Sequence, residues 1–514
     1  MSTAKARWTK LNTSRDQVLH RARQAAELTI PSLMPPEGSD ENTTLPSPYQ
    51  SLGARGVNNL ASKLLLALLP PSTPFFRFQM AEEVIEELGA ERAHIEEFLR
   101  KLENRILKHI ERSNLRVMLS PLLKHLVVTG NGLLYLPTKG QARMYTLSQY
   151  CVVRDPQGTV TEIVIKEIVH PQTLPEDIRE ACSVDLPSPE DHQKATNQTE
   201  VYTWVTMTED KKVEWHQEIN EIEVPDSNGR AKADESPFLA LRWQSAPDED
   251  YGRGLVEEYI GDLRSLDGLA KAILSFAAAS AKVVFLVSPN SITDDDALQQ
   301  AESGDFVVGR EEDVSVLQID KFNDYRSAKD VMDDLTLRLS HAFLLQSGTI
   351  RDAERVTAVE IQAQARELED VLGGVYTVQS QELQLPLIRR IIVGMKKAGT
   401  FPQLPKVNGR DAVEPMIVTG FEALGRGHEL NRLRGYFADL QGLLGEQAMT
   451  LFNTTDLAKK MATYHNVDIA DELLSEEEVA QRQQQAAMQQ AAAQATPGVA
   501  QEVAKGVVAQ RTQP

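Results

Sequence analysis

Acidic and histidine side chains are the first candidates for chemistry in this sequence, because carboxylates and imidazoles hold metals and move protons. The run Asp294-Asp295-Asp296 could attract a divalent ion, but three consecutive acids are more typical of a solvated loop or a helix N-terminus. His428 next to Glu429 is an isolated pair, and the ten histidines are scattered. We therefore expect no metal site.

The motifs of nucleotide and hydrolase sites are also missing. The chain has no Gly-Lys-Ser/Thr phosphate loop, no His-Glu-x-x-His helix and no Gly-x-Ser-x-Gly elbow. Gly130-x-Gly132 and Gly252-x-Gly254 lack the third glycine of a dinucleotide loop and are better interpreted as turn glycines. The sequence thus predicts a protein that is not an enzyme and that uses no cofactor.

A polar, glycine-containing stretch from Gln346 to Asp352, followed by Glu354 and Arg355, has two interpretations. One is a surface loop with local ion pairs, which contribute little free energy in water. The other is a loop that touches nucleic acid loosely, since phosphate contacts position a duplex without reading its sequence. The residues alone leave both interpretations open.

Length and composition narrow the class of protein. The chain has 514 residues, which suggests about three lobes, and a formal charge of −20, which argues against binding by phosphate neutralisation. Its two cysteines, Cys151 and Cys182, argue against a disulfide framework. Met1 to Lys10 lacks the apolar region of a signal peptide, and no stretch approaches the ~18 apolar residues of a membrane span.

Two long helices with a strand-rich segment between them dominate the pattern. Residues 255–281 place Leu263, Leu266, Ala270 and Ala277 at steps of three or four, which predicts a helix. Its second half consists mainly of small residues, which permit close helix packing. Residues 282–320 change to short β-branched runs, and helical periodicity returns at 327–345. A third helix begins near residue 356, with kinks expected at Gly373-Gly374 and Pro386.

The remaining chain alternates helices with one β-rich module. The strands are expected within 133–245, including a hairpin at Asp155-Pro156-Gln157-Gly158. Helices are expected at 16–28, 51–69, 82–112, 115–129, 429–444 and 456–464. The Gln/Ala-rich stretch 475–495 favours helix over a low-complexity tail, because both residue types are good helix formers.

The order of these elements and the amino-acid sequence of four stretches resemble the bacteriophage portal proteins (head-to-tail connectors) of short-tailed podophages. The stretches are Ser51–Leu64, Tyr251–Leu266, Glu354–Ala358 and Gln381–Leu387. The resemblance implies a mixed α+β fold, mainly α-helical, in an elongated subunit that forms a ring. It also implies these regions: wing 1–250, stem helix 251–282, clip 283–321, stem helix 322–345, tunnel loop 346–355, wing 356–425 and crown 426–514.

By the same resemblance, we expect a homododecamer at one capsid vertex that forms the channel for DNA packaging and ejection. Its partners would be double-stranded DNA in transit, the terminase motor, major capsid and scaffolding proteins, and tail or adaptor proteins, with no membrane. The protein would lie in the virion, and in the host cytoplasm during assembly. An acidic channel lining would then repel phosphates and prevent DNA from sticking.

The resemblance also assigns candidate residues to two sites. The DNA-channel candidates in the tunnel loop are Gln346, Ser347, Thr349, Arg351 and Arg355. The candidates for packing between neighbouring stem helices are Ala270, Ala277, Ala281, Lys329, Asp333 and Arg338.

Two alternatives remain from the residues themselves. A helical scaffold or adaptor without enzymatic activity should show heptads sustained over three or more repeats, which glycines, prolines and strands interrupt here. A carboxylate-dependent hydrolase should show clustered acids at fixed spacing, and the sequence has none. Both alternatives explain the strand-rich insert between two long helices less well than the portal interpretation does.

Overall fold

The computed structural model describes residues 3–40, 42–70, 75–80, 92–138, 140–186, 198–280, 284–289, 295–317, 322–345, 373–402, 406–407, 410–411, 413–417 and a few positions between 435 and 442. The chain forms two units, Met1–Phe421 and Glu422–Pro514. The elements below belong to the first unit. Of the helices expected after residue 425, only helical positions between 435 and 442 are described; 456–464 and 475–495 lie outside the described residues.

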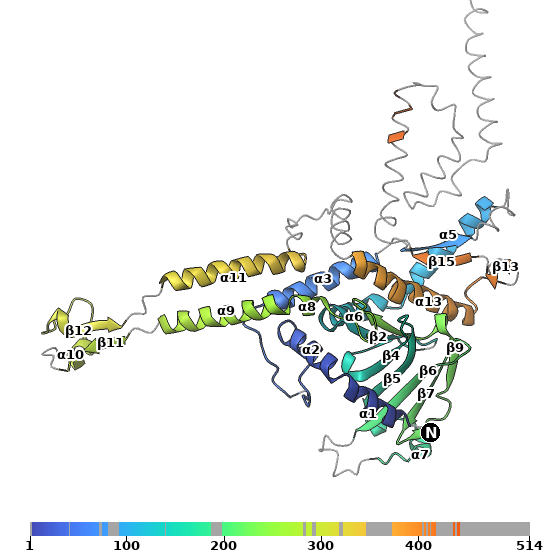
Figure 1. The fold of residues 1–514 in the computed structure, drawn as a ribbon, viewed down its shortest axis with the longest axis horizontal. Coiled ribbons are helices and arrows are strands. Elements are labelled where there is room, and N and C mark those ends of the chain that lie inside the picture. Colours follow the sequence, from blue (N-terminus) through green and yellow to red (C-terminus); the bar gives the residue numbers. More distant parts are fainter. Residues whose placement is uncertain are drawn as a thin grey trace, which may run out of the picture. The chain divides into compact units, whose positions relative to one another are not determined.

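The N-terminal part is helical (Figure 1). It comprises α1 (Ala4–Ser14), α2 (Asp16–Glu27), a 3₁₀ turn (Pro31–Leu33), α3 (Leu52–Leu68), α5 (Arg92–Arg112) and α6 (Leu115–Thr129). The periodicity did not predict α1, because its outward positions are polar and only Ala4 and Trp8 are buried. These two residues pack on the β module, so α1 depends on tertiary contact.

Buried Arg15, where α1 ends, ties the N-terminal helices to the β module. Its guanidinium donates to the carbonyl oxygens of Leu147, at 2.6 Å, and Tyr150, and to Asn12 Oδ1 at 2.8 Å. A buried guanidinium is tolerated only where acceptors surround it. The bend between α1 and α2 is therefore fixed by an interaction 132 residues away in the sequence.

The β module contains two antiparallel sheets. The first has the order β10-β2-β3, with β2 (Asn131–Tyr135), β3 (Arg143–Tyr145) and β10 (Phe238–Arg242). The second has the path β4-β5-β6-β7-β8, and β9 also pairs with β7. Its strands are β4 (Tyr150–Arg154), β5 (Val160–Val169), β6 (Thr199–Met207), β7 (Lys212–Ile219), β8 (Ile222–Glu223) and β9 (Gly229–Lys232). The short helix α7 (Glu176–Ala181) lies in the connection between β5 and β6.

Turn chemistry predicted the β4–β5 hairpin correctly. The turn residue Gly158 has a φ of +85°, and the Asp155 carboxylate accepts hydrogen bonds from the backbone N–H groups of Gln157 and Thr159. This is an Asx turn, in which the side chain replaces missing backbone partners. The hairpin confirms the β-rich module expected between residues 133 and 245.

The later chain is built of helices and short strands (Figure 1). In order these are α8 (Leu255–Glu258), α9 (Ile260–Ser280), β11 (Val284–Val287), α10 (Asp295–Gln300), β12 (Val314–Leu317), α11 (Phe322–Ala342), a helical stretch 373–379, a π-helix (Ser380–Gln384), α13 (Leu385–Lys397), β13 (Lys406–Val407), β14 (Arg410–Asp411) and β15 (Val413–Ile417). β11 pairs with β12, β13 with β14, and β15 with β1 (Phe76–Met80), all antiparallel.

The turn glycines of Gly130-x-Gly132 and Gly252-x-Gly254 lie where the backbone after α6 closely approaches the backbone before α8. Gly130 ends α6 with a φ of +76°, as expected for a glycine after a helix. A Cβ on Gly130 would lie 2.5 Å from the backbone of Arg253, and one on Gly254 would lie 2.7 Å from Val128 O. The side chain of Asn131 also exchanges two hydrogen bonds with the Gly252 backbone, both 2.8 Å. The chain entering α8 is thereby fixed against the end of α6.

Three expectations need correction. The helix expected at 255–281 is interrupted at Tyr259, between α8 and α9. Of the β-branched runs expected within 282–320, residues 304–309 form no strand and make no ladder hydrogen bonds with β11 or β12. The helix expected at 327–345 begins at Phe322 and ends at Ala342.

A π-helix lies directly before Pro386, where a kink was expected. These five residues, Ser380–Gln384, have a wider turn that shifts the following side chains around the axis. Because the chain is helical from 373 to 397, the missing N–H of Pro386 withholds one intrahelical hydrogen bond, and the wider turn before it leaves room for the ring. None of the described helices is both long and apolar enough to cross a bilayer.

His125, on the buried face of α6, provides a test of this packing. Burial lowers the pKa of its imidazole from 6.5 to about 4. The folded chain therefore binds fewer protons than the unfolded chain between these values, and its stability falls as the pH falls from 6.5 towards 4. Its Nδ1 has no hydrogen-bond partner among the described residues.

We expect His125→Leu to remove this loss, since leucine has nearly the same volume and does not titrate. The free energy of unfolding, measured with urea at pH 7, 6 and 5, should fall more steeply for the wild type. The difference between the two proteins should grow by about 2 kcal/mol between pH 7 and pH 5. Parallel pH profiles would show that His125 is not buried as a neutral group.

Candidate functional site: the helix pair and its anchors

The helices α9 and α11 lie side by side and run antiparallel (Figure 1). Three contacts along the pair define the register. Phe276 stacks on Tyr325 with ring centroids 5.7 Å apart, and Asp262 faces Arg338 at 3.8 Å. Tyr259, just before α9, meets Phe343, just after α11, at 6.4 Å. The paired residue numbers sum to 600–602, so the two helices stay in register along their length.

Burial along the pair is uneven. Leu263 and Leu266 of α9 pack with Leu335 and Leu339 of α11, and all four are buried. None of the described residues of α9 from Lys271 to Ser280 is buried. The pair is therefore anchored in the core at one end. The rest of α9 presents mainly small and apolar side chains to solvent, whereas the matching part of α11 presents charged ones such as Lys329 and Asp333.

The stem-packing candidates occupy different environments on this pair. Ala270 is half-buried, and Ala277, Lys329 and Asp333 are exposed. Arg338 forms ion pairs within the chain, with Asp262 and, at 3.4 Å, with Asp334. The structure thus brings together the candidates on α9 and α11 as one helix pair, although Arg338 already has intramolecular partners. Ala281 lies outside the described residues.

The DNA-channel candidates Gln346, Ser347, Thr349, Arg351 and Arg355 all lie outside the described residues, which end at Leu345 and resume at Gly373. The structure describes the two chain ends that flank this segment. Both flanking ends contact α3. The periodicity of the sequence predicted this helix but not these contacts.

Asp267 anchors α9 to the chain before α3, a contact that sequence analysis missed. Its Oδ1 accepts hydrogen bonds from the backbone N–H groups of Tyr49, at 2.6 Å, and Gln50, at 3.3 Å. The ammonium of Lys271, one turn later, lies 5.4 Å from the centroid of the Tyr49 ring. In the sequence, Asp267 is only an acidic residue between apolar helix positions. This pattern is too common to predict a specific contact.

The end of α11 packs against α3 at Gly56. A Cβ at this glycine would lie 2.5 Å from the Phe343 ring, which is fully buried. The stretch Ser51–Leu64 carried one of the family resemblances, and Gly56 lies within it. Its glycine is explained by the approach of an aromatic ring 287 positions later in the sequence, which no local pattern reveals.

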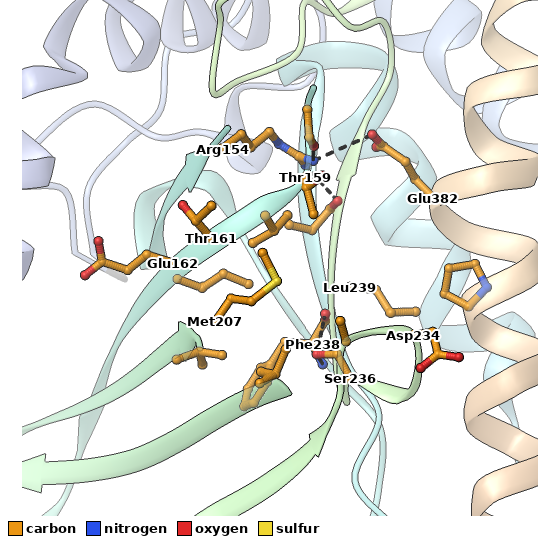
Figure 2. Close-up of a pocket in the computed structure, with 18 of the residues that line it drawn as sticks. Arg154, Thr159, Thr161, Glu162, Met207, Asp234, Ser236, Phe238, Leu239 and Glu382 are labelled. Atoms are coloured by element: carbon orange, nitrogen blue, oxygen red, sulfur yellow. Dashed lines mark hydrogen bonds and ion pairs between the residues drawn. The ribbon is translucent and has the colours of Figure 1, made fainter. Parts of the chain in front are cut away.

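A second feature is a cavity of about 310 Å³ between the β module and the helices after residue 373 (Figure 2). Strands β5, β6 and β10 provide much of its wall, and Leu385, Pro386 and Arg389 of α13 provide another part. Apolar side chains such as Met207, Phe238 and Leu239 line it, and Arg154, Glu382 and Asp234 lie around them in Figure 2.

Side chains around this cavity cap the free edge of β10. Because residues 237 and 243 bond to the neighbouring strand, residues 238, 240 and 242 direct their backbone groups away from it. Ser236 Oγ donates to Phe238 O at 3.2 Å, Arg154 Nη2 to Ala240 O at 2.9 Å, and Gln379 Nε2 to Arg242 O at 2.6 Å. A capped edge cannot add a strand from another chain.

Glu382 of the π-helix completes this cap. Its carboxylate accepts from the Arg242 backbone N–H at 2.8 Å and from the Arg242 guanidinium at 2.9 and 2.6 Å. Arg154 adds an ion pair at 3.7 Å, and its guanidinium pKa is lowered by burial despite the Glu382 charge. All three side chains are at most 16% exposed. The π-helix thus locks to the β module by a buried charge network.

This network is structural, because the Arg154 guanidinium donates to acceptors within the protein: Asp250 O, Gly158 O and Ala240 O. No group of three or more His, Cys, Asp or Glu side chains in the described part of the chain is placed to hold a metal ion. The charged groups at this site therefore bind one another, with Glu382 paired to Arg154 and Arg242.

We expect Glu382→Gln to destabilise the chain by about 3–5 kcal/mol, because it leaves two buried guanidinium groups without their counter-charge. The matched control is Asp234→Asn at the same cavity, whose partner Arg389 lies 3.8 Å away and is one-third exposed. That exposed pair should contribute under about 1 kcal/mol. Urea unfolding at pH 7 measures both, and equal effects would contradict the buried network.

Comparison with known proteins identifies the family. The family model "Bacteriophage head to tail connecting protein" matches residues 1–470. The chain is 40% identical to the portal protein of Enterobacteria phage T3 over 483 residues, covering 92% of this chain and 89% of the relative. It is 39% identical to the portal protein of Escherichia phage T7 over 488 residues, 93% of this chain and 89% of the relative.

A more distant relative covers nearly the full length. The portal protein of Enterobacteria phage SP6 is 32% identical over 511 residues, 97% of this chain and 96% of the relative. Among solved structures, a chain in the neck of an empty GTA particle is 12% identical, with a TM-score of 0.37, covering 74% of this chain and 85% of that chain. That score is too low to support a conclusion about the fold. The sequence matches alone establish that this chain belongs to the bacteriophage head to tail connecting protein family.

Proposed function

We propose that this connector is the portal subunit of a short-tailed phage, and that twelve copies close into a ring at one capsid vertex. The observation that carries the proposal is the α9–α11 pair, which is buried at one end and elsewhere exposes small and apolar side chains on α9 and charged ones on α11. A head-to-tail interface whose rotation closes generates a ring from one kind of subunit. The family match and the portal names of the relatives support the same assignment.

The regions follow from this assignment as proposals. Residues 251–282 and 322–345 would be the stem helices, which agrees with the positions of α9 and α11 in the chain. Residues 283–321 would be the clip, where β11 and β12 pair. We assign 1–250 and 356–425 to the wing, 346–355 to the tunnel loop and 426–514 to the crown.

The ring would be the channel for entry and exit of double-stranded DNA. Gln346, Ser347, Thr349, Arg351 and Arg355 would contact the duplex loosely and without sequence preference. The net charge of −20 supports this interpretation, because an acidic lining keeps phosphates from binding tightly. The protein would thus guide DNA without catalysing a reaction.

The energy for packaging would come from a separate terminase motor that docks on the ring. Major capsid and scaffolding proteins would surround the ring in the head, and tail or adaptor proteins would attach below it. The protein would therefore reside at the portal vertex of the virion, after assembly in the host cytoplasm.

Negative-stain electron microscopy and mass photometry of one purified sample test the ring. We expect rings with an axial hole and a mass near twelve times 57.1 kDa. A uniform monomer or dimer at all concentrations would overturn the proposal.

We also expect Leu274→Glu combined with Leu337→Glu to reduce the ring population at least tenfold. These side chains are 56% and 48% exposed on α9 and α11, so the substitutions cost little in the single chain. At a subunit interface they would bury unpaired charges. The control Val117→Glu changes a side chain of α6 that is 74% exposed. Loss of rings together with a large fall in melting temperature would indicate misfolding rather than a lost interface.

A further inference from the structure

One face of α3 holds the end of α11. Gly56, Asn59 and Lys63 are spaced three and four residues apart, so they share that face. Phe343 packs on Gly56, and Asn59 Nδ2 donates to the carbonyl oxygens of Phe343 and Leu344, both at 3.1 Å. Lys63 Nζ donates to Leu344 O at 2.7 Å.

These bonds pair two carbonyl groups of the turn that follows α11, which ends at Ala342. Because Phe343 and Leu344 lie beyond the helix, their carbonyl groups have no partner within it. After α11 the chain turns sharply: Leu345 N donates to Ser340 O at 2.8 Å, and Leu344 has a φ of +53°. This left-handed position normally favours glycine, so a leucine there requires support from outside the turn. Asn59 and Lys63 supply it, and the ammonium also faces the negative end of the helix dipole.

The same helix holds the chain where it resumes after residue 372. Tyr376 Oη donates to Ala67 O at 2.8 Å, and Gln384 Nε2 donates to Leu68 O at 2.7 Å. Ala67 and Leu68 form the last turn of α3, whose carbonyls also lack partners within their helix. Gln384 is fully buried, so this contact excludes water.

Both flanks of the segment 346–372 are therefore fixed to one short helix. The contacts at Asn59 and Leu68 are nine residues apart on α3, which corresponds to about 14 Å at 1.5 Å per residue. We propose that Asn59 and Lys63 are positioning residues that set where this segment starts, by capping the end of α11. The proposal rests on the proposed function, in which this segment contains the DNA-contacting residues of the channel.

The test uses full-length Asn59→Leu combined with Lys63→Met, which removes both donors but keeps side chains of similar size. Asn58→Leu is the matched control, because Asn58 is adjacent, exposed and makes no side-chain hydrogen bond that the structure describes. Lys63→Arg is the conservative variant, since it retains a charged donor. Each protein is examined for rings by electron microscopy and for hydrogen exchange in the peptide covering residues 340–345.

The structure predicts a local effect on exchange. Amides 343–345 of the double variant should exchange at least tenfold faster, because their hydrogen bonds close the end of α11. Peptides from α9 should be unchanged, and Asn58→Leu and Lys63→Arg should resemble the wild type. A merely destabilised fold would instead speed exchange throughout α3, α9 and α11.

The functional measurement is the yield of DNA-filled heads when each variant replaces the phage's own subunit. We expect the double variant to form rings but to package at least tenfold less DNA, whereas Lys63→Arg should keep most of the wild-type yield. Wild-type packaging by the double variant, or a loss without faster exchange at 343–345, would overturn the positioning role. If the wild-type protein forms no rings, the proposed function fails, whereas the exchange measurement still decides whether Asn59 and Lys63 cap α11.

Discussion

Unpaired carbonyls at helix ends impose the constraint on which this arrangement depends. Such carbonyl groups find partners at two places on α3. The side chains of α3 donate to carbonyls after α11, and the last carbonyls of α3 accept from Tyr376 and Gln384. Each contact joins parts of the chain that are about 280 to 320 residues apart in sequence. Since a buried carbonyl without a partner costs free energy, the positions of these elements are coupled through one helix.

The β module is joined to the later helices by a related rule. The free edge of β10 exposes backbone groups, and the side chains of Arg154, Gln379 and Glu382 bond to them. Glu382 lies in the π-helix and Gln379 directly before it, and both side chains reach this edge. Edge protection and attachment of the helix after residue 373 are thus achieved by the same contacts.

Stability within the single chain is distributed unequally. Residues of α9 and α11 near Leu263 and Leu339 belong to the main core, whereas none of the described residues between 284 and 317 is buried. A two-stranded hairpin such as β11–β12 is only marginally stable in isolation. A ring would supply the missing neighbours, which is consistent with a connector that is completed by assembly.

Local sequence patterns were sufficient to predict the helices with clear apolar stripes, the β4–β5 hairpin and the membership of a connector family. These features depend on local patterns: α6 was predicted at its observed bounds, and Asp155 to Gly158 contain the chemistry of their turn. Stretches of sequence that resemble the family, such as Ser51–Leu64, indicated the family without showing what each residue contacts.

The contacts of those residues are visible only in the folded chain. Gly56 faces Phe343, Asn59 and Lys63 bond to carbonyls that follow α11, and Arg15 is buried among acceptors of the β module. The helix α1 and the break at Tyr259 were likewise invisible to periodicity. The physical reason is that these features depend on partners more than eighty residues away, whereas sequence patterns report only the periodicity and turn chemistry of neighbouring residues.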